Sequence, residues 1–327
     1  MKVLVTGILP EEVMALIKTE HEVEANYEDR PIERERLLQA IKDKDGLLCM
    51  ISDAVDTELL DRAPRLRVIA NFGVGFNNID LDAATRKSIL VSNTPGVLTD
   101  ATADAAFALI LSTARRVVEG DKKTRQGEFK FWAPFHFLGR EVSGKTLGIV
   151  GMGRIGQAVS KRARGFDMNV LYHDSFRLDA EKEKSLGVKF GSLDTLFTTA
   201  DFISLHIPLT DETYHLINRE TLGKMKPTAY LINTSRGPVI DEKALVEALK
   251  KEKIAGAGLD VYEKEPDLAP GLAGLSNVVL LPHVGSATLE TRTKMARLAA
   301  ENLLAGLRGE KPSCCLNWQA GEPSSQP

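Results

Sequence analysis

The stretch TLGIVGMGRIGQAVSKRAR, residues 146–164, decides the fold of this chain. Its first five residues predict a short buried strand, residues 154–164 predict a helix, and the glycines at 151, 153 and 156 match G-x-G-x-x-G between them. The first glycine permits a tight turn, the second lets the backbone approach a pyrophosphate, and the third lets the helix pack closely on the strand. Because a helix N-terminus also presents unpaired N–H groups, the segment predicts a dinucleotide-binding site rather than a glycine turn without a ligand.

An acidic residue follows the next predicted strand. Asp174 lies 18 residues after Gly156, where a carboxylate accepts hydrogen bonds from the adenosine ribose hydroxyls and repels a 2′-phosphate. We therefore expect NAD as the cofactor, with NADP less favoured. Arg177, three residues further along, is a cation that would soften this preference.

The strand and helix pattern around the glycine loop recurs along the chain. Short β-branched apolar runs alternate with helix-length stretches, which indicates an α/β fold with doubly wound parallel sheets buried on both faces. An Asn-Thr-Pro-Gly turn at residues 93–96 interrupts the alternation, so we expect two sheets. The first set of predicted strands, four or five in number, includes Lys2–Thr6, Gly46–Ile51, Arg67–Phe72 and Ile89–Ser92. The second set comprises Thr146–Val150, Asn169–His173, Phe202–His206, Ala229–Asn233, Ala257–Val261 and Val278–Leu281.

Three further segments have a distinct character. We expect one helix over Ala101–Val118, capped by Thr99 or Asp100, and a final helix from about Thr288 to Leu307. The aromatic-rich stretch 126–140 lacks periodicity and predicts a packed loop or an arm against a partner subunit. The tail from Gly309 is rich in Pro, Gly and Ser and is expected to be frayed.

Composition and charge exclude several classes of protein. Of the 327 residues, 43% are hydrophobic and 27% charged, and the net charge is −3. A nucleic-acid-binding protein would show a basic excess or stripe, and a membrane span would need roughly 18 consecutive apolar residues, whereas the longest apolar run covers only residues 105–111. The cysteines, Cys49, Cys314 and Cys315, are too few and too irregular for a disulfide framework or a zinc site, so we expect a cytoplasmic protein without a metal.

Three charged or titratable residues follow predicted strands of the second set. Arg236 follows the strand that ends at Asn233, Glu265 the next strand and His283 the last one. In an open parallel sheet these positions meet beside the dinucleotide. Arg236 can hold a carboxylate and polarise a keto oxygen, His283 can protonate the developing alkoxide, and Glu265 can hold the imidazole and stabilise its charged form. Each residue alone is more often a surface ion pair, a turn or a structural histidine; together, behind a dinucleotide motif, they predict hydride transfer.

Four motifs resemble those of the D-isomer-specific 2-hydroxyacid dehydrogenase family. They are GMGRIG at 151–156, NTSRGPVID at 233–241, GLDVYEKEP at 258–266 and PHVGSAT at 282–288. The stretches ANFGVGFNNID at 70–80 and TPGVLTDATAD at 94–104 are most similar to the glyoxylate/hydroxypyruvate reductase branch. The resemblance covers nearly the whole chain.

The resemblance implies an architecture and an activity. It implies a Rossmann NAD-binding domain at residues 98–285, inserted into a flavodoxin-like substrate domain formed by residues 1–97 and 286–327. It also implies a homodimer formed through residues 100–140, with Trp132 either reaching the partner's active site or packing within the arm. The implied activity is NAD-dependent reduction of small 2-keto acids, glyoxylate and hydroxypyruvate foremost, to D-2-hydroxy acids.

Site residues follow from the same motif matches. Arg236, Glu265 and His283 take the catalytic roles described above. The residues implied to bind the cofactor are Val74, Thr102, Gly151, Gly153, Arg154, Ile155, Gly156, Asp174, His206, Ile207, Pro208, Thr213, Thr234, Asp260 and Gly285. The residues implied to bind the substrate are Ile51, Val74, Gly75, Arg236 and His283, with Val74 and Gly75 offering backbone N–H groups to the substrate carboxylate.

Departures from the family pattern narrow the range of expected substrates. Many relatives have Arg-Ser-x-Thr where this chain has Ile51-Ser-Asp-Ala54, which disfavours phosphorylated substrates, and formate dehydrogenases have Gln where Glu265 stands. A 2-ketogluconate reductase and a D-lactate-type dehydrogenase remain alternatives, because pocket size decides between them. A third alternative, an NADH-sensing corepressor-like binding protein, could keep the same three residues.

Overall fold

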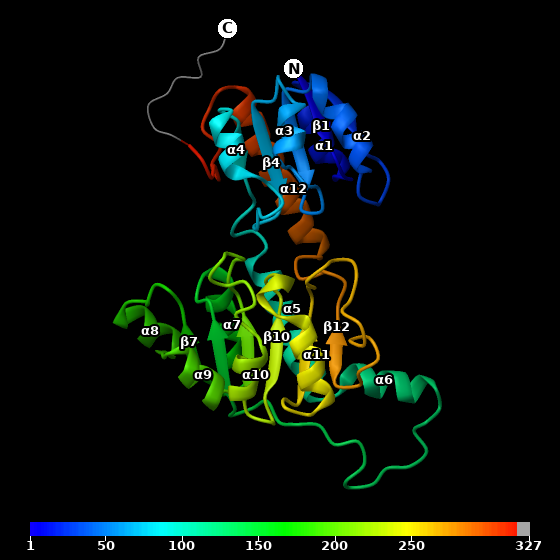
Figure 1. The fold of residues 1–327 in the computed structure, drawn as a ribbon, viewed down its shortest axis with the longest axis vertical. Coiled ribbons are helices and arrows are strands. Elements are labelled where there is room, and N and C mark those ends of the chain that lie inside the picture. Colours follow the sequence, from blue (N-terminus) through cyan, green and yellow to red (C-terminus); the bar gives the residue numbers. More distant parts are fainter. Residues whose placement is uncertain (319–327) are drawn as a thin grey trace. The chain divides into compact units, whose positions relative to one another are not determined.

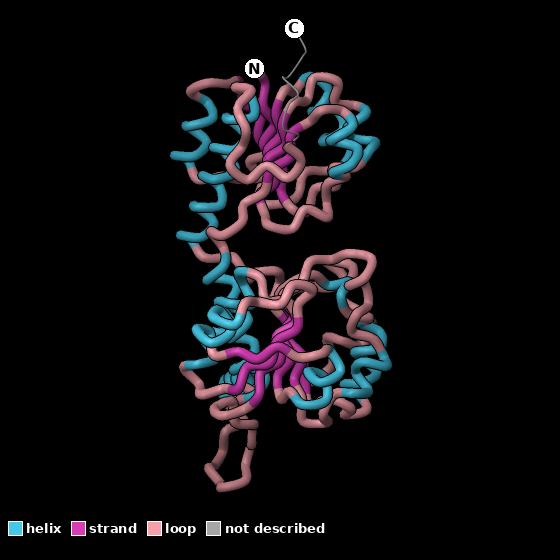
Figure 2. The backbone as a smooth tube through the Cα atoms, turned by 90° about the vertical axis from the view of Figure 1, so that its left-hand side faces the viewer, coloured by secondary structure: helices cyan, strands magenta, loops and turns pink. Residues whose placement is uncertain are grey.

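Short apolar segments form the strands of two separate parallel sheets. The computed structural model describes residues 1–318. The chain divides into a first unit, Met1–Leu98 with the segment from Ala287 onward, and a second unit, Thr99–Ser286 (Figure 1). In each unit the strands lie in the middle, with helices on both sides (Figure 2). This arrangement explains why the strands are apolar on both faces.

The first unit contains a five-stranded sheet. Its strand order, β2-β1-β3-β4-β5, is that of flavodoxin-like folds, and every neighbouring pair is parallel. The strands are β1 (Lys2–Val5), β2 (Glu22–Ala25), β3 (Gly46–Met50), β4 (Val68–Phe72) and β5 (Leu90–Ser92). The helices are α1 (Glu11–Lys18), α2 (Arg34–Ala40), α3 (Thr57–Asp61), α4 (Leu81–Arg86) and α12 (Leu289–Leu307).

The last helix returns to the first sheet. Thr288 caps α12 by accepting a hydrogen bond from the Thr291 N–H group. A β-carbon at Gly306 would lie 2.6 Å from a methyl group of Val68, so this glycine lets α12 approach β4 closely. The second unit is therefore an insertion between β5 and α12.

The second unit contains a seven-stranded parallel sheet of order β12-β11-β10-β9-β6-β7-β8. The chain reverses direction across the sheet between β6 and β9, as in Rossmann folds. The strands are β6 (Thr146–Val150), β7 (Asn169–His173), β8 (Val188–Phe190), β9 (Phe202–Leu205), β10 (Tyr230–Asn233), β11 (Gly256–Leu259) and β12 (Val278–Leu280). The helices are α5 (Thr99–Ala114), α6 (Val117–Arg125), α7 (Arg154–Arg164), α8 (Ala180–Leu186), α9 (Leu193–Thr199), α10 (Arg219–Lys224) and α11 (Glu242–Lys250).

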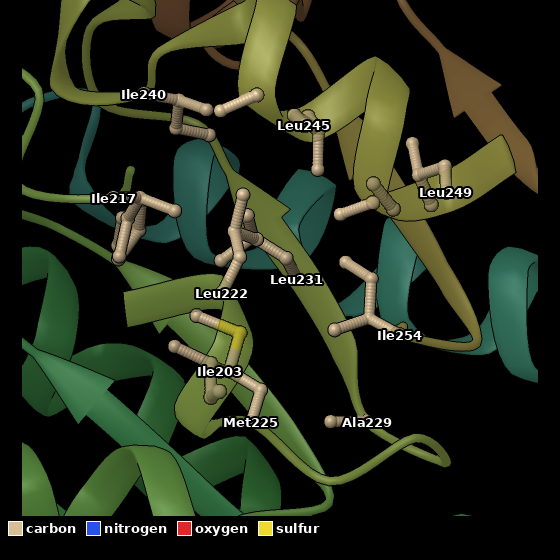
Figure 3. Packing of buried hydrophobic residues seen from close by; sticks show 14 of the residues in the cluster. Ile203, Ile217, Leu222, Met225, Ala229, Leu231, Ile240, Leu245, Leu249 and Ile254 are labelled. Carbon is tan, nitrogen blue, oxygen red and sulfur yellow. The ribbon is translucent and has the colours of Figure 1, made fainter. Parts of the chain in front are cut away.

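Two apolar layers hold this sheet between its helices. One layer joins strand residues such as Ile203 and Leu231 to Leu222 of α10 and Leu245 of α11 (Figure 3). The layer on the other face joins Ile149 and other strand residues to α5, α7 and α8. Burial of a side chain of this size contributes about 1.5–3 kcal/mol, so the two layers fix the strand ends on which the site depends.

The predicted fold class is confirmed. The structure differs from the prediction at the edge strands of the two sheets and at the ends of several elements. The first sheet has five strands, within the four or five expected, but neither β2 nor β8 is among the predicted ranges. Short edge strands need not be apolar on both faces, and the sequence of β2 is Glu-Val-Glu-Ala. The single helix expected over Ala101–Val118 is wrong. Helix α5 begins at Thr99 and ends at Ala114, and α6 starts anew after Arg116, whose φ of 54° is left-handed.

The expectation of a frayed tail is wrong for residues 310–318. Cys315 forms an antiparallel bridge with Ser92, and the Leu316 N–H group donates to the Val91 carbonyl at 2.8 Å. The Asn317 side chain adds hydrogen bonds to the backbone of β5 and of the turn before it. The rest of the tail, 319–327, lies outside the described residues.

Within residues 1–318, no helix combines the length and hydropathy needed to span a lipid bilayer.

Candidate active site

The glycine loop joins β6 to α7 at the point where the strand order reverses. Gly151 has a φ of 94°, and a β-carbon there would lie 2.4 Å from the His206 carbonyl oxygen. A β-carbon at Gly156 would lie 2.1 Å from the Gly151 carbonyl oxygen, whereas one at Gly153 would meet no atom within 4 Å. The first and third glycines are thus required by packing within the protein, and Gly153 leaves open space beside the N-terminus of α7. This is the cradle that a pyrophosphate needs.

Asp174 reaches back to this loop from the end of β7. Its Oδ2 atom accepts a hydrogen bond from the Met152 N–H group at 2.6 Å, and Oδ1 accepts from the Phe176 N–H group at 3.0 Å. The carboxylate therefore lies beside the glycine loop, as a ribose-binding acid must.

Two buried polar atoms lie at the ends of neighbouring strands. His206 follows β9 and shares a hydrogen bond between Nε2 and the Ser204 hydroxyl at 2.8 Å. Its Nδ1 atom and the Thr234 hydroxyl after β10 are buried and have no hydrogen-bond partner within the described structure. Burial lowers the pKa of His206 to about 4, so its ring is neutral at pH 7. Buried polar atoms normally have partners, so these two fit the edge of a site that a polar ligand such as NAD completes.

Val74, one of the remaining predicted cofactor residues, lies in the first unit, and the others belong to the second unit. Thr213 closes the loop after β9 by donating to the Pro208 carbonyl at 2.7 Å. Thr102 of α5 is buried and lies near Gly285, where a β-carbon would be 3.6 Å from its methyl group. Arg154 and Ile155 begin α7, and Ile207 follows His206.

Arg236 lies in the turn after β10. The Asn233 side chain shapes this turn: its Nδ2 atom donates to the Arg236 carbonyl at 2.9 Å, and its Oδ1 atom accepts from the Ser235 N–H group at 2.9 Å. The Arg236 guanidinium donates to the Ser235 carbonyl at 2.7 Å. Burial lowers the pKa of Arg236, and the charge of Glu265 acts in the opposite direction, which places this carboxylate within electrostatic reach of the guanidinium.

Glu265 and His283 form a hydrogen-bonded pair. His283 Nδ1 donates to Glu265 Oε2 at 2.8 Å, and Glu265 Oε1 accepts from the Tyr262 N–H group at 3.0 Å. Burial alone would raise the pKa of Glu265, but the hydrogen bond and charge of His283 outweigh it, and the pKa is lowered. The carboxylate is thus ionised at pH 7, and its bond to Nδ1 leaves Nε2 of His283 as the nitrogen that can exchange a proton with a substrate.

Asp260 holds the loop that carries His283. Its two carboxylate oxygens accept hydrogen bonds from the N–H groups of Val284 and Gly285, both at 2.7 Å. His283 itself has a φ of 55°, a left-handed backbone that residues with a side chain seldom adopt. A strained backbone persists where its surroundings over-determine it, and the fully buried Asp260 supplies that constraint.

One contact between the turns that carry Arg236 and Glu265 is not predicted by the sequence. Gly237, next to Arg236, lies so close to the segment before Glu265 that a β-carbon would be 1.8 Å from the Tyr262 carbonyl oxygen. Nothing in the local sequence identifies this contact, because the two segments are 25 residues apart in the chain.

The predicted substrate residues Ile51, Val74 and Gly75 lie together in the first unit, after β3 and β4. A β-carbon at Gly73 would be 2.4 Å from the Ile51 side chain, so the two loops touch. Asn71, buried in β4, donates to the Gly75 carbonyl at 2.9 Å, and Asn93 donates to the Val74 carbonyl at 2.7 Å. Neither asparagine is among the residues predicted from the sequence, although a polar residue inside an apolar strand is a signal for Asn71.

Comparison with known proteins identifies the family. The model of the D-isomer specific 2-hydroxyacid dehydrogenase family, NAD binding domain, matches residues 107–285. The glyoxylate reductase of Pyrococcus furiosus is 52% identical over 320 residues, which are 97% of this chain and 95% of that protein. The chain belongs to the D-isomer specific 2-hydroxyacid dehydrogenase family. It is therefore an oxidoreductase with an NAD-binding domain, as its motifs predicted.

Solved structures of family members share the whole fold of this enzyme. A glyoxylate reductase from Paecilomyes thermophila has a TM-score of 0.87 and 34% identity, with 97% of this chain and 98% of that chain covered. An NADPH-dependent glyoxylate/hydroxypyruvate reductase from Sinorhizobium meliloti has a TM-score of 0.86 and 33% identity, with 96% of each chain covered. The Sinorhizobium meliloti enzyme is NADPH-dependent, whereas the matched family domain is named for NAD binding, so side chains rather than the fold must set the cofactor preference.

Proposed function

We propose that this enzyme reduces small 2-keto acids, glyoxylate and hydroxypyruvate foremost, to D-2-hydroxy acids with NADH. The observation that carries the proposal is the 2.8 Å hydrogen bond between His283 and Glu265. This pair lies within electrostatic reach of Arg236, on the sheet edge that bears the glycine loop. The identity to a glyoxylate reductase over nearly the full chain supports the substrate class.

The side chains of the second unit divide the chemistry between them. Bound NADH supplies the hydride that is transferred to the keto carbon. The Arg236 guanidinium holds the substrate carboxylate and polarises the keto oxygen, since its planar fork matches both acceptors. His283 donates the proton from Nε2 to the same oxygen, so that hydride and proton together complete the hydroxyl group. Glu265 accepts the hydrogen bond from Nδ1 and so orients the imidazole for this transfer.

We also propose that Val74 and Gly75 offer backbone N–H groups to the substrate carboxylate, with Ile51 close to the substrate. The hydrogen bond from Asn93 to the Val74 carbonyl supports this role for Gly75, because the Val74 carbonyl and the Gly75 N–H group belong to the same planar peptide. We propose, in addition, that the residues of the second unit that the motif matches imply for cofactor binding do bind NADH.

The direct test follows NADH oxidation at the nicotinamide absorbance. Glyoxylate, hydroxypyruvate, pyruvate and 2-ketogluconate are compared at equal concentrations, and the series is repeated with NADPH. We expect rapid turnover of glyoxylate and hydroxypyruvate. Turnover of 2-ketogluconate or pyruvate alone would overturn the substrate assignment but not the chemistry. Tight NADH binding without turnover of any keto acid would instead indicate a sensing protein.

Replacement of Asp174 by alanine should narrow the preference for NADH over NADPH. The variant loses charge-assisted hydrogen bonds to the ribose of NADH, and it no longer repels the 2′-phosphate of NADPH. We expect the dissociation constant of NADH to rise by about tenfold, because one such hydrogen bond is worth roughly 1.5–3 kcal/mol. Titration of nicotinamide fluorescence measures both constants, and a wild-type preference for NADPH would show that the ribose site is assigned wrongly.

We further propose that the enzyme is a homodimer formed through residues 100–140. After α6 the chain leaves the body of the second unit as a long loop (Figure 1). This loop exposes 79% of Trp132 and 86% of Phe135, and Phe129, Phe131 and Leu138 are also exposed. Monomeric proteins rarely expose so many neighbouring apolar side chains. Phe137 of the same loop is partly buried, and the Arg116 guanidinium lies 4.0 Å from its ring centroid.

The variant Trp132→Ser/Phe135→Ser should therefore shift the protein from dimer to monomer in light scattering. Leu289→Ser is the matched control, because Leu289 is 81% exposed but lies outside the arm. A wild-type monomer, or a double variant that stays dimeric, would contradict the proposed interface.

The cytoplasmic location expected from the cysteine pattern stays a prediction.

A further inference from the structure

The cation beside the ribose site is already engaged by another side chain. Arg177 lies between β7 and α8, three residues after Asp174. Its Nε atom donates to Glu183 Oε1 at 2.8 Å, and its Nη2 atom donates to Oε2 of the same carboxylate at 3.0 Å. Two parallel hydrogen bonds between a guanidinium and a carboxylate are the geometry with which arginine also binds a phosphate. Glu183 therefore engages the Nε–Nη2 edge of the guanidinium, two of its five N–H donors, and pairs the positive charge that a 2′-phosphate would require.

The carboxylate of Glu183 is itself anchored from the protein interior. The hydroxyl of Tyr172 donates to Glu183 Oε1 at 2.8 Å, and the same hydroxyl accepts from the Leu178 N–H group at 2.9 Å. The ring of Tyr172 is fully buried in β7. Only 13% of the Glu183 side chain is exposed, against 62% of the Arg177 side chain. The hydrogen bonds from Arg177 and Tyr172 lower the pKa of Glu183, so it is ionised at pH 7.

The face of the Arg177 guanidinium is engaged as well. It lies 5.4 Å from the centroid of the Phe190 ring, and this ring packs edge-on against Tyr172 and in a stacked arrangement against His173. A cation over an aromatic face gains attraction from the ring quadrupole. A 2′-phosphate that recruited Arg177 would have to separate it from both Glu183 and Phe190.

We propose that Glu183 is a specificity-determining residue that enforces the NAD preference by holding Arg177 away from the 2′-phosphate of NADP. Asp174 repels the phosphate directly, and Glu183 acts by engaging Arg177, the first cationic residue after Asp174 in the sequence. The proposal deepens the cofactor assignment and rests on it. Cofactor choice in this chain therefore depends on a carboxylate nine residues beyond the ribose-binding acid.

The test compares the affinities of Glu183→Gln for NADH and NADPH. Glutamine keeps the size of the side chain and a partner for Tyr172, but it removes the charge that binds Arg177. We expect the ratio of the NADPH to the NADH dissociation constant to fall by about tenfold, the lower end of what a charge-assisted hydrogen bond contributes. Titration of nicotinamide fluorescence measures both constants without turnover, and added salt should diminish the gain.

Three comparisons separate this mechanism from a general change in charge. Glu181→Gln removes the same charge from an exposed position in the first turn of α8 and should leave the ratio unchanged. Arg177→Ala/Glu183→Gln should lose the gain, because the released cation is absent. Arg177→Ala alone should leave NADPH affinity close to that of the wild type, since Arg177 is already withheld.

Three results would overturn the proposal, and the third would also refute the cofactor assignment. An unchanged ratio in Glu183→Gln, or weaker NADPH binding by Arg177→Ala alone, would show that Glu183 does not withhold Arg177. A wild-type enzyme that binds NADPH more tightly than NADH would instead refute the cofactor assignment on which the proposal rests, and the proposal with it.

Discussion

Replacement of His283 by alanine should lower the turnover of glyoxylate by about a hundredfold or more, because general-acid catalysis contributes on that scale. The Nε2 atom of His283 is the only proton donor that the proposal provides for the keto oxygen. Its partner Glu265 is ionised and cannot replace it. The binding of NADH should survive, since the glycine loop, Asp174 and Thr234 do not depend on the imidazole.

Single-turnover measurements with saturating NADH isolate the chemical step of this variant. His215→Ala is the matched control, because His215 also pairs with a glutamate, Glu263, at 3.1 Å in the same unit. This control should retain turnover close to that of the wild type. If His283→Ala turns over as fast as His215→Ala, His283 has no part in proton transfer. If NADH binding is lost together with turnover, the defect is one of folding or cofactor binding and the catalytic assignment fails.

The second large effect is expected for Gly237→Ala. A β-carbon at this position would overlap the Tyr262 carbonyl group and lie 2.5 Å from the Glu263 nitrogen. These are backbone atoms, so the clash cannot be relieved by a side-chain rotation. Overpacking typically costs about 1–3 kcal/mol, and for a rigid backbone contact we expect about 3 kcal/mol or more. The turn that carries Arg236 would also be pushed away from the segment that carries Glu265.

Thermal unfolding measures this effect on stability. A loss of about 3 kcal/mol corresponds to a fall of roughly 10 °C in Tm for a domain of this size. Gly223→Ala is the control, because Gly223 lies inside α10 and a β-carbon there meets no atom within 4 Å. Alanine should stabilise that helix slightly. If the Tm of Gly237→Ala equals that of the wild type, the two turns are not tightly packed.

Much of the fold was predictable because it depends on local patterns. The strand that ends at Val150, the glycine loop and α7 were each predicted at the residues where they occur, since a buried parallel strand and a tight turn leave direct traces in composition. The edge strand β2 was missed because it is half charged. The break between α5 and α6 was missed because the apolar pattern continues through it, whereas a left-handed residue, Arg116, ends the first helix.

The glycine motif and the strand endings are enough to predict a dinucleotide site with Arg236, Glu265 and His283 on the sheet edge beside it, because the carboxyl ends of parallel strands meet at one edge. Three contacts appear only in the folded chain: Glu265 with His283, Asp260 with the His283 loop, and Glu183 with Arg177. These contacts join side chains whose distance depends on strand order and on the path of each loop. Such distances leave no pattern in the residues on either side, so the chain must fold before they exist.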